Sequence, residues 1–171
     1  GGVGRERLRH PFVEPGRRAV EAGVLREAVA VALVVAPPAV VGNWASEAAK
    51  FAPDLRVVIH HGASRASADQ LASEVARADV VITTYSTAVR DVDALSKLNW
   101  NRMVLDEAQA IKNPANETAQ QLRRIPARTK IALTGTPIEN GLGDLWAILD
   151  FTNPGLVGNR RQRFHECELL A

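Results

Sequence analysis

Residues 103–113 read Met-Val-Leu-Asp-Glu-Ala-Gln-Ala-Ile-Lys-Asn, an apolar run that ends in the acidic pair Asp106 and Glu107. A second apolar run downstream ends in the loop Thr134-Gly135-Thr136-Pro137. A strand of a parallel sheet delivers its functional side chains at its carboxyl end, where a carboxylate can hold Mg²⁺ and a neighbour can polarise water. The two strand ends together carry side chains suited to phosphate and metal.

Outward from these runs, short apolar segments rich in β-branched residues alternate with segments of helical periodicity. The expected strands lie at 31–35, 56–60, 80–84, 102–105 and 130–133, and the expected helices at 44–51, 68–78, 86–98, 116–125 and 142–151. This alternation predicts an α/β fold, a mostly parallel sheet with helices on both faces. Asn43 and Ser67 stand where two of the helix N-caps are expected.

Size and composition are those of one globular domain. The 171 residues are 46% hydrophobic, and a domain near this size buries roughly 70% of its unfolded surface. The 21 Lys and Arg residues against 19 Asp and Glu give a net charge of +2, too small by itself to identify a nucleic-acid binder. Basic clusters at 123–130 and 160–163 are read first as solvated faces.

Several classes of protein are disfavoured by the sequence. Cys167 is the single cysteine, so no internal disulfide can form, and no Cys and His cluster has the spacing of a metal site. No apolar run approaches the roughly 20 residues that span a bilayer, and no secretion signal is evident. A cytoplasmic protein in a reducing compartment is expected.

The acidic pair alone is weak evidence, because Asp-Glu pairs also cap helices or face solvent at strand ends. The aromatic and histidine residues have plain structural readings as well. Trp44 is expected to pack its helix onto the sheet, Tyr85 is left open between packing and base stacking, and His60-His61 is expected to be a structural strand end without a metal.

Four ordered motifs carry a resemblance to the first RecA-like lobe of the Swi/Snf-type helicase-like ATPases of helicase superfamily two, in its bacterial branch. The resemblance runs from about residue 30 to 158. The motifs are Ala36-Pro37 with Asn43-Trp44 and Glu47 (motif Ia), Ile82–Tyr85 (motif Ib), Leu105–Asn113 (motif II, an Asp-Glu-Ala-Gln box) and Leu133–Asn140 (motif III), with Leu145-Trp146 and Asp150-Phe151 continuing the pattern.

The resemblance implies a RecA-like P-loop NTPase lobe that uses ATP and Mg²⁺. Asp106 would bind Mg²⁺, directly or through water, and Glu107 would orient the attacking water. Gln109 would relay the nucleotide state, while Thr134, Gly135 and Thr136 would couple hydrolysis to movement of the lobes.

Motifs Ia and Ib would face nucleic acid. Their backbone amides, together with Pro37, Asn43 and the hydroxyls of Thr83 and Thr84, would contact phosphates without reading bases, so the implied partner is double-stranded DNA bound independently of sequence. No membrane partner is expected.

Two parts of the family pattern are missing from this sequence. No Gly-Lys-Thr phosphate loop precedes Val31, and the nearest candidate, Gly1–Glu6, has Arg5 in place of lysine and Glu6 in place of a hydroxyl. The second RecA-like lobe, which supplies an arginine finger worth roughly 10³–10⁵ in rate, is also missing. We therefore expect the chain by itself not to hydrolyse ATP.

The expected organisation is a divergent segment at 1–28, an incomplete ATP-binding lobe at 29–158 and a divergent tail at 159–171. The expected function is that of a fragment of a DNA-dependent ATPase that translocates on double-stranded DNA. The alternative is a non-catalytic module, binding DNA or protein, or a gene remnant that retains the fold.

Overall fold

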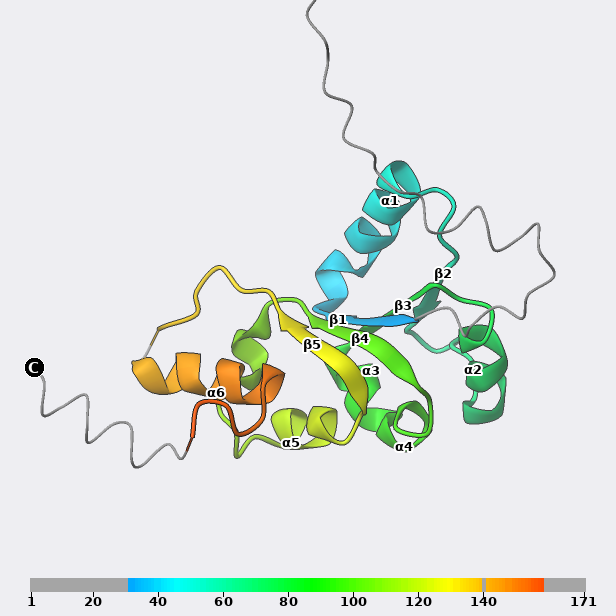
Figure 1. Ribbon diagram of the computed structural model, residues 1–171. Helices are drawn as coiled ribbons and strands as arrows, with labels where there is room; N and C mark the ends of the chain where they lie inside the picture. The colour runs from blue at the N-terminus through cyan, green and yellow to red at the C-terminus, as the bar shows by residue number, and fades with distance from the viewer. Residues whose placement is uncertain (1–30, 140, 159–171) are drawn as a thin grey trace, which may run out of the picture.

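The computed structural model describes residues 31–139 and 141–158, which form a parallel sheet flanked by helices (Figure 1). The terminal segments 1–28 and 159–171, the loop candidate Gly1–Glu6 and Asn140 lie outside the described residues. The strands are β1 (Ala32–Ala36), β2 (Val57–His60), β3 (Val80–Thr84), β4 (Trp100–Leu105) and β5 (Ala127–Ala132). The helices are α1 (Val41–Phe51), α2 (Ala68–Val75), α3 (Tyr85–Arg90), α4 (Val92–Leu95), α5 (Glu117–Arg123) and α6 (Leu142–Thr152), with short 3₁₀ turns η1 (Pro38–Val40) and η2 (Ala108–Ile111).

The strands lie in the order β2-β3-β1-β4-β5, and every neighbouring pair is parallel. Because all five strands run the same way, their carboxyl ends meet at one edge of the sheet. Central positions of β1 and β3 are wholly buried, as expected for parallel strands that are covered on both faces. The predicted α/β class, with its mostly parallel sheet, is confirmed.

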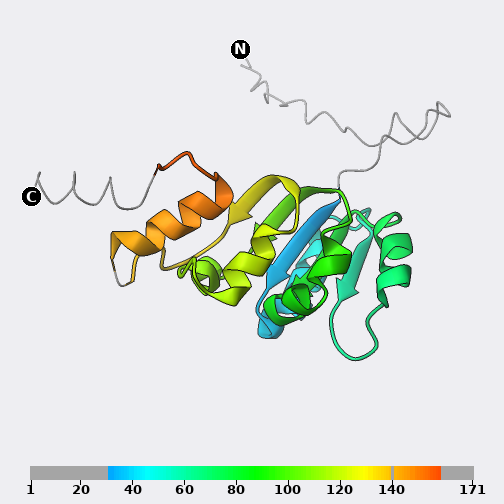
Figure 2. The same ribbon diagram turned by 90° about the horizontal axis from the view of Figure 1, so that it is seen from below.

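Two hydrophobic cores cover the two faces of the sheet. On one face, buried residues of α2 to α6, such as Leu71, Leu95 and Leu122, pack against Leu33 and Met103 of the sheet. On the other face, α1 packs against a smaller core that includes Val34 of β1 and Ile82 of β3. Figures 1 and 2 show this asymmetry, with α1 on one side of the strands and α3, α4 and α5 on the other.

The sheet ends at β5, which pairs with β4 on one side only among the described residues. α6 contacts β5 and places the buried ring of Phe151 under two cations, with Lys130 Nζ 4.7 Å and Arg123 Cζ 5.4 Å from the ring centroid. Ile131 and Leu133 remain exposed, at 36% and 40%.

Several boundaries differ from the sequence-based expectation. The segment expected as one helix over 86–98 is broken at Asp91, whose backbone leaves the helical region at φ −102°, ψ 20°. β5 begins three residues earlier than expected, because Ala127 pairs with Trp100. Asn43 is not an N-cap: α1 begins at Val41 behind a 3₁₀ turn, so Asn43 lies exposed inside the first turn. Ser67 does cap α2, in a capping box with Gln70.

No helix among the described residues is long and apolar enough to cross a membrane.

Candidate functional site

Asp106 directly follows β4, at the carboxyl edge of the sheet. Its backbone N–H donates to Val35 O at 2.9 Å, which extends the β1–β4 ladder by one residue. Its half-buried carboxylate accepts two bonds: Oδ1 from the backbone N–H of Glu107 at 3.0 Å and Oδ2 from Nε1 of Trp44 at 2.8 Å. Its backbone carbonyl accepts a bond from the Tyr85 hydroxyl at 2.7 Å. Four contacts therefore define the position of this acid.

Glu107 has a left-handed backbone conformation, φ 52° and ψ 55°, and no other non-glycine residue described has a positive φ. Such a conformation costs roughly 1–2 kcal/mol for a residue with a Cβ atom. The turn is fixed at its far side by the next residue, because Ala108 N–H donates to Leu133 O at 2.9 Å. The strained turn directs the Glu107 side chain into solvent at the carboxyl edge of the sheet.

A chain of hydrogen bonds joins the end of β4 to the loop after β5. Gln109 Nε2 donates to Glu107 Oε2 at 2.6 Å, and Thr134 Oγ1 donates to Gln109 Oε1 at 3.1 Å. Thr136 N–H then donates to Thr134 Oγ1 at 3.2 Å. The structure thus brings the residues expected to couple hydrolysis to movement into one contiguous relay. Gly135 lies in the same loop, where an added Cβ would meet no atom within 4 Å, so nothing in the structure requires glycine there.

Lys112 is a member of this region that sequence reasoning missed. Its Nζ lies 3.0 Å from Glu139 Oε2 and 3.5 Å from Asp144 Oδ2, and its side chain is only 9% exposed. The same Asp144 oxygen accepts a bond from Glu139 N–H at 3.1 Å. Lys112 therefore ties η2 to the start of α6. Its place in motif II was visible in the sequence, but its acidic partners lie too far along the chain to be chosen from the pattern.

The residues expected to face nucleic acid differ in how exposed they are. Thr83 and Thr84 are both fully buried: Thr83 Oγ1 donates to His60 O at 2.8 Å, and Thr84 Oγ1 donates to Thr87 Oγ1 at 2.9 Å while accepting from Thr87 N–H. A phosphate contact by either hydroxyl would require these bonds to open. Asn43 is exposed and Pro37 half-buried.

His60 is buried and has a carboxylate partner that the sequence did not reveal. Its Nε2 lies 2.9 Å from Asp91 Oδ2, and the same carboxylate receives two bonds from Arg65, at 2.6 and 3.1 Å. The Arg65 hydrogen bonds, aided by His60, lower the pKa of Asp91 from its usual value against the opposing effect of burial. The cluster joins the end of β2 to the break between α3 and α4, so His60 is structural, as expected, but as part of an ion-pair cluster.

The aromatic residues near the strand ends have specific partners. Burial, and next the charges of Asp106 and Glu107, raise the pKa of the Tyr85 hydroxyl, which keeps it protonated as a donor. The Trp44 ring packs against the core under α1, as expected, yet its indole N–H reaches Asp106. Trp100, the first residue of β4, is buried and donates to Leu95 O at 2.9 Å. The indole nitrogen of the half-buried Trp146 has no partner among the described residues.

The site fits a magnesium ion of the kind that is held mainly by nucleotide and water. Within the described ranges no three His, Cys, Asp or Glu residues gather into a metal cluster. Mg²⁺ characteristically binds through one or two carboxylates, substrate phosphates and several waters, so it needs no such cluster. Among the described residues, one donor bonds each carboxylate oxygen of Asp106, which leaves a lone pair on each oxygen for a cation.

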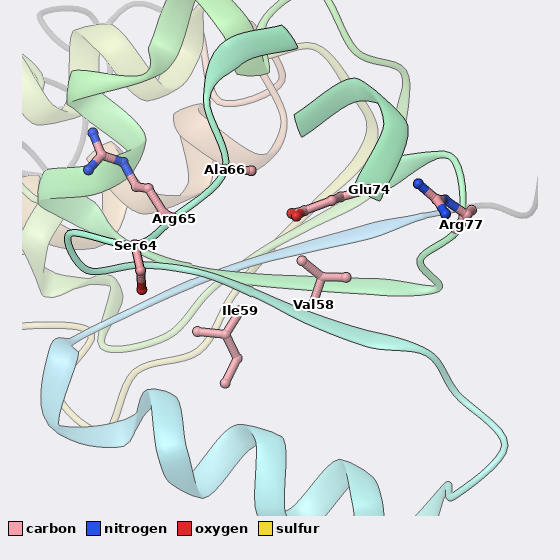
Figure 3. Close-up of a pocket in the computed structure, with 7 residues that line it drawn as sticks. All are labelled: Val58, Ile59, Ser64, Arg65, Ala66, Glu74 and Arg77. Atoms are coloured by element: carbon pink, nitrogen blue, oxygen red, sulfur yellow. The ribbon is translucent and has the colours of Figure 1, made fainter. Parts of the chain in front are cut away.

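Two cavities lie away from this edge, beside β2 and α2. The first, of about 430 Å³, is shown in Figure 3, where Val58 and Ile59 leave β2 on opposite sides and Glu74 and Arg77 approach from the helix side. The second, of about 500 Å³, adjoins the His60 cluster and carries both cations and acids, including Arg90 and Asp93. Neither of these two cavities has Asp106 or Glu107 in its lining.

Comparison with known proteins places the chain in a family. A model of the SNF2-related domain matches residues 17–169, and the match reaches into both terminal segments that were expected to diverge. YwqA of Bacillus subtilis, whose name describes an ATP-dependent helicase/translocase, is 44% identical over 127 residues, which cover 74% of this chain and 14% of YwqA. The TATA-binding protein-associated factor MOT1 of Saccharomyces cerevisiae is 36% identical over 129 residues, covering 75% of this chain and 7% of MOT1.

Solved structures agree. The SWI2/SNF2 ATPase core of Sulfolobus solfataricus in complex with dsDNA is 39% identical and superposes with a TM-score of 0.67, covering 78% of this chain and 27% of that core. A second structure of the core domain gives a TM-score of 0.62. The expected resemblance and RecA-like fold are confirmed, while the chain spans at most 14% of the two relatives named above. This chain belongs to the family of SNF2-related domains.

Proposed function

We propose that the described lobe supplies the metal-binding and coupling half of an ATP site in a motor that moves along double-stranded DNA. One observation carries the proposal: Asp106, Glu107, Gln109 and Thr134 form one connected group at the carboxyl edge of the sheet. Two of the proteins named above support the same reaction class: YwqA is a helicase/translocase by name, and the Sulfolobus solfataricus ATPase core was solved with dsDNA.

The chemistry of phosphoryl transfer suits these residues. Asp106 would hold Mg²⁺, which would supply positive charge to offset the negative charge that develops on the nucleotide phosphates. The bond from Trp44 holds the Asp106 carboxylate in one orientation. One residue further on, the carboxylate of Glu107 faces solvent and is suited to accept a hydrogen bond from the attacking water. Because Gln109 bonds Glu107 and receives a bond from Thr134, a shift of the Thr134 loop would move Glu107 as well.

The roles proposed for nucleic acid are less direct. Backbone groups at the ends of β1 and β3, with exposed Asn43, are proposed to meet the phosphates of a duplex. The Thr83 and Thr84 hydroxyls would join only after their internal bonds open. Contacts of this kind carry no base readout, so affinity is expected to be equal for unrelated duplexes and to fall as salt rises.

Mn²⁺ binding followed by electron paramagnetic resonance tests the nucleotide half of the proposal. The 171-residue chain is titrated with Mn²⁺ and ATP as wild type, Asp106→Asn, Glu107→Gln and, as a matched surface control, Glu117→Gln. Of the three variants, we expect only Asp106→Asn to abolish the binding of Mn²⁺. Glu107→Gln and Glu117→Gln should retain it. Wild-type affinity in Asp106→Asn would refute the proposed metal role.

Duplex binding completes the test. Fluorescence anisotropy with two duplexes of unrelated sequence, at rising salt, should give equal affinities with a negative salt slope. The chain could bind duplex DNA in a salt-dependent way and yet show no binding of Mn²⁺ that depends on Asp106. That result would favour the second candidate function, a non-catalytic DNA-binding module. If the chain binds neither Mn²⁺ nor duplex DNA, both the proposed function and the DNA-binding alternative are wrong.

A further inference from the structure

Asp106 is held from both faces of the sheet by two aromatic side chains. Trp44 belongs to α1 and packs against the core on the α1 face, while Tyr85 begins α3 and packs against the core on the opposite face. Trp44 is 62 residues away from Asp106 in sequence and Tyr85 is 21 residues away. Three elements that are separate in the chain therefore meet at one acidic residue.

The two aromatic residues donate hydrogen bonds to different parts of Asp106. The Trp44 indole N–H donates to carboxylate Oδ2 at 2.8 Å, and the Tyr85 hydroxyl donates to the backbone carbonyl at 2.7 Å. The first bond fixes the rotation of the carboxylate, and the second fixes the backbone just before the strained turn at Glu107. Packing alone would not require either bond, because a phenylalanine ring fills most of the same space.

A donor bonded to a metal-binding carboxylate orients its lone pairs and tunes its affinity for the cation. We infer that Trp44 and Tyr85 are positioning residues for Asp106, setting the direction and strength with which its carboxylate holds a divalent cation. The inference rests on the proposed function, since it takes Asp106 as the metal-binding acid. It assigns to Trp44 and Tyr85 a role beyond the packing and base stacking considered from sequence.

Nuclear magnetic resonance of the indole N–H groups tests the contact without any activity. The chain has three tryptophans, so the Trp44 signal is assigned by its loss in Trp44→Phe. Asp106→Asn should shift the Trp44 signal and leave that of Trp100, bonded to Leu95 O, in place. An unmoved Trp44 signal would overturn the inference.

Mn²⁺ binding to the full chain then measures the effect on the cation. Trp44→Phe should weaken binding roughly 10-fold, and Tyr85→Phe, which removes a single oxygen, should weaken it less. Trp100→Phe is the matched control, because it also removes a bonded indole N–H from a buried ring, and it should bind as wild type.

The outcomes separate this inference from the proposed function. If Asp106→Asn abolishes Mn²⁺ binding while Trp44→Phe and Tyr85→Phe bind as wild type, the positioning role is wrong and the proposed function stands. If Asp106→Asn binds as wild type, the proposed function fails and the inference falls with it.

Discussion

Glycine at position 107 should give a more stable protein than alanine at the same position, the reverse of their usual order. Glu107 has φ 52° and ψ 55°, where a Cβ atom costs roughly 1–2 kcal/mol. Glycine is free of that cost but loses about 0.5–1 kcal/mol more conformational entropy on folding than alanine. The difference leaves Glu107→Gly more stable than Glu107→Ala by about 0.5–1 kcal/mol. Both variants lose the bond from Gln109 equally, so it cancels.

Urea unfolding followed by tryptophan fluorescence gives the free energy of unfolding of each variant by linear extrapolation. Ala49, exposed in α1, is the control position: Ala49→Gly should lower the free energy of unfolding by about 1 kcal/mol, the ordinary helix penalty. If Glu107→Gly proves no more stable than Glu107→Ala while Ala49→Gly behaves as expected, the left-handed turn does not exist in solution and the reasoning fails.

Three further changes test the packing and the ion pairs by urea unfolding. Phe151→Ala removes a fully buried ring and should lower the free energy of unfolding by about 3–5 kcal/mol. Phe51→Ala is the control and should lower it by about 0.5 kcal/mol or less, since Phe51 is 73% exposed. Equal losses in the two variants would contradict the packing of α6. Ser67→Ala breaks the capping box of α2 and should cost about 1 kcal/mol, with faster amide exchange in that helix as a second readout. Asp91→Asn should be less stable than wild type at neutral pH by about 1–3 kcal/mol. Because the folded pKa of Asp91 lies below its unfolded value near 3.9, its stabilising effect is complete above that value and is lost as pH falls through the folded pKa. The difference from wild type should therefore shrink below about pH 4; a difference that stays constant into acid would contradict the sign.

The sequence predicted the layers of the fold because apolar runs and helical periodicity report burial directly. It predicted one helix over 86–98 where the structure has two, because the break at Asp91 depends on Arg65 and His60, which reach it from a distant loop and strand. The misplaced cap at Asn43 has a similar cause: the 3₁₀ turn after Pro37 starts α1 earlier, and nothing in the local pattern distinguishes the two starts.

The site was predictable where it depends on strand ends and not where it depends on side-chain direction. Asp106 and Thr134 both follow adjacent parallel strands, so their proximity follows from topology alone. The bond from Trp44 to Asp106 requires the indole to reach past the α1 core to a neighbouring strand, and a hydrophobic pattern records only that the ring is partly buried. The contacts of Trp44 and Tyr85 with Asp106 therefore appear only in the folded structure.

Among the described residues no strand pairs with the outer side of β5, and we expect this edge to make the behaviour of the isolated chain in solution depend on ionic strength. An unpaired strand edge can template aggregation, and exposed Ile131 and Leu133 add apolar surface to it. The exposed Arg128 in the same strand opposes this, since two such edges repel each other. Salt screens that repulsion but not the apolar attraction. The purified chain should therefore stay dispersed in dilute buffer and self-associate as salt is added.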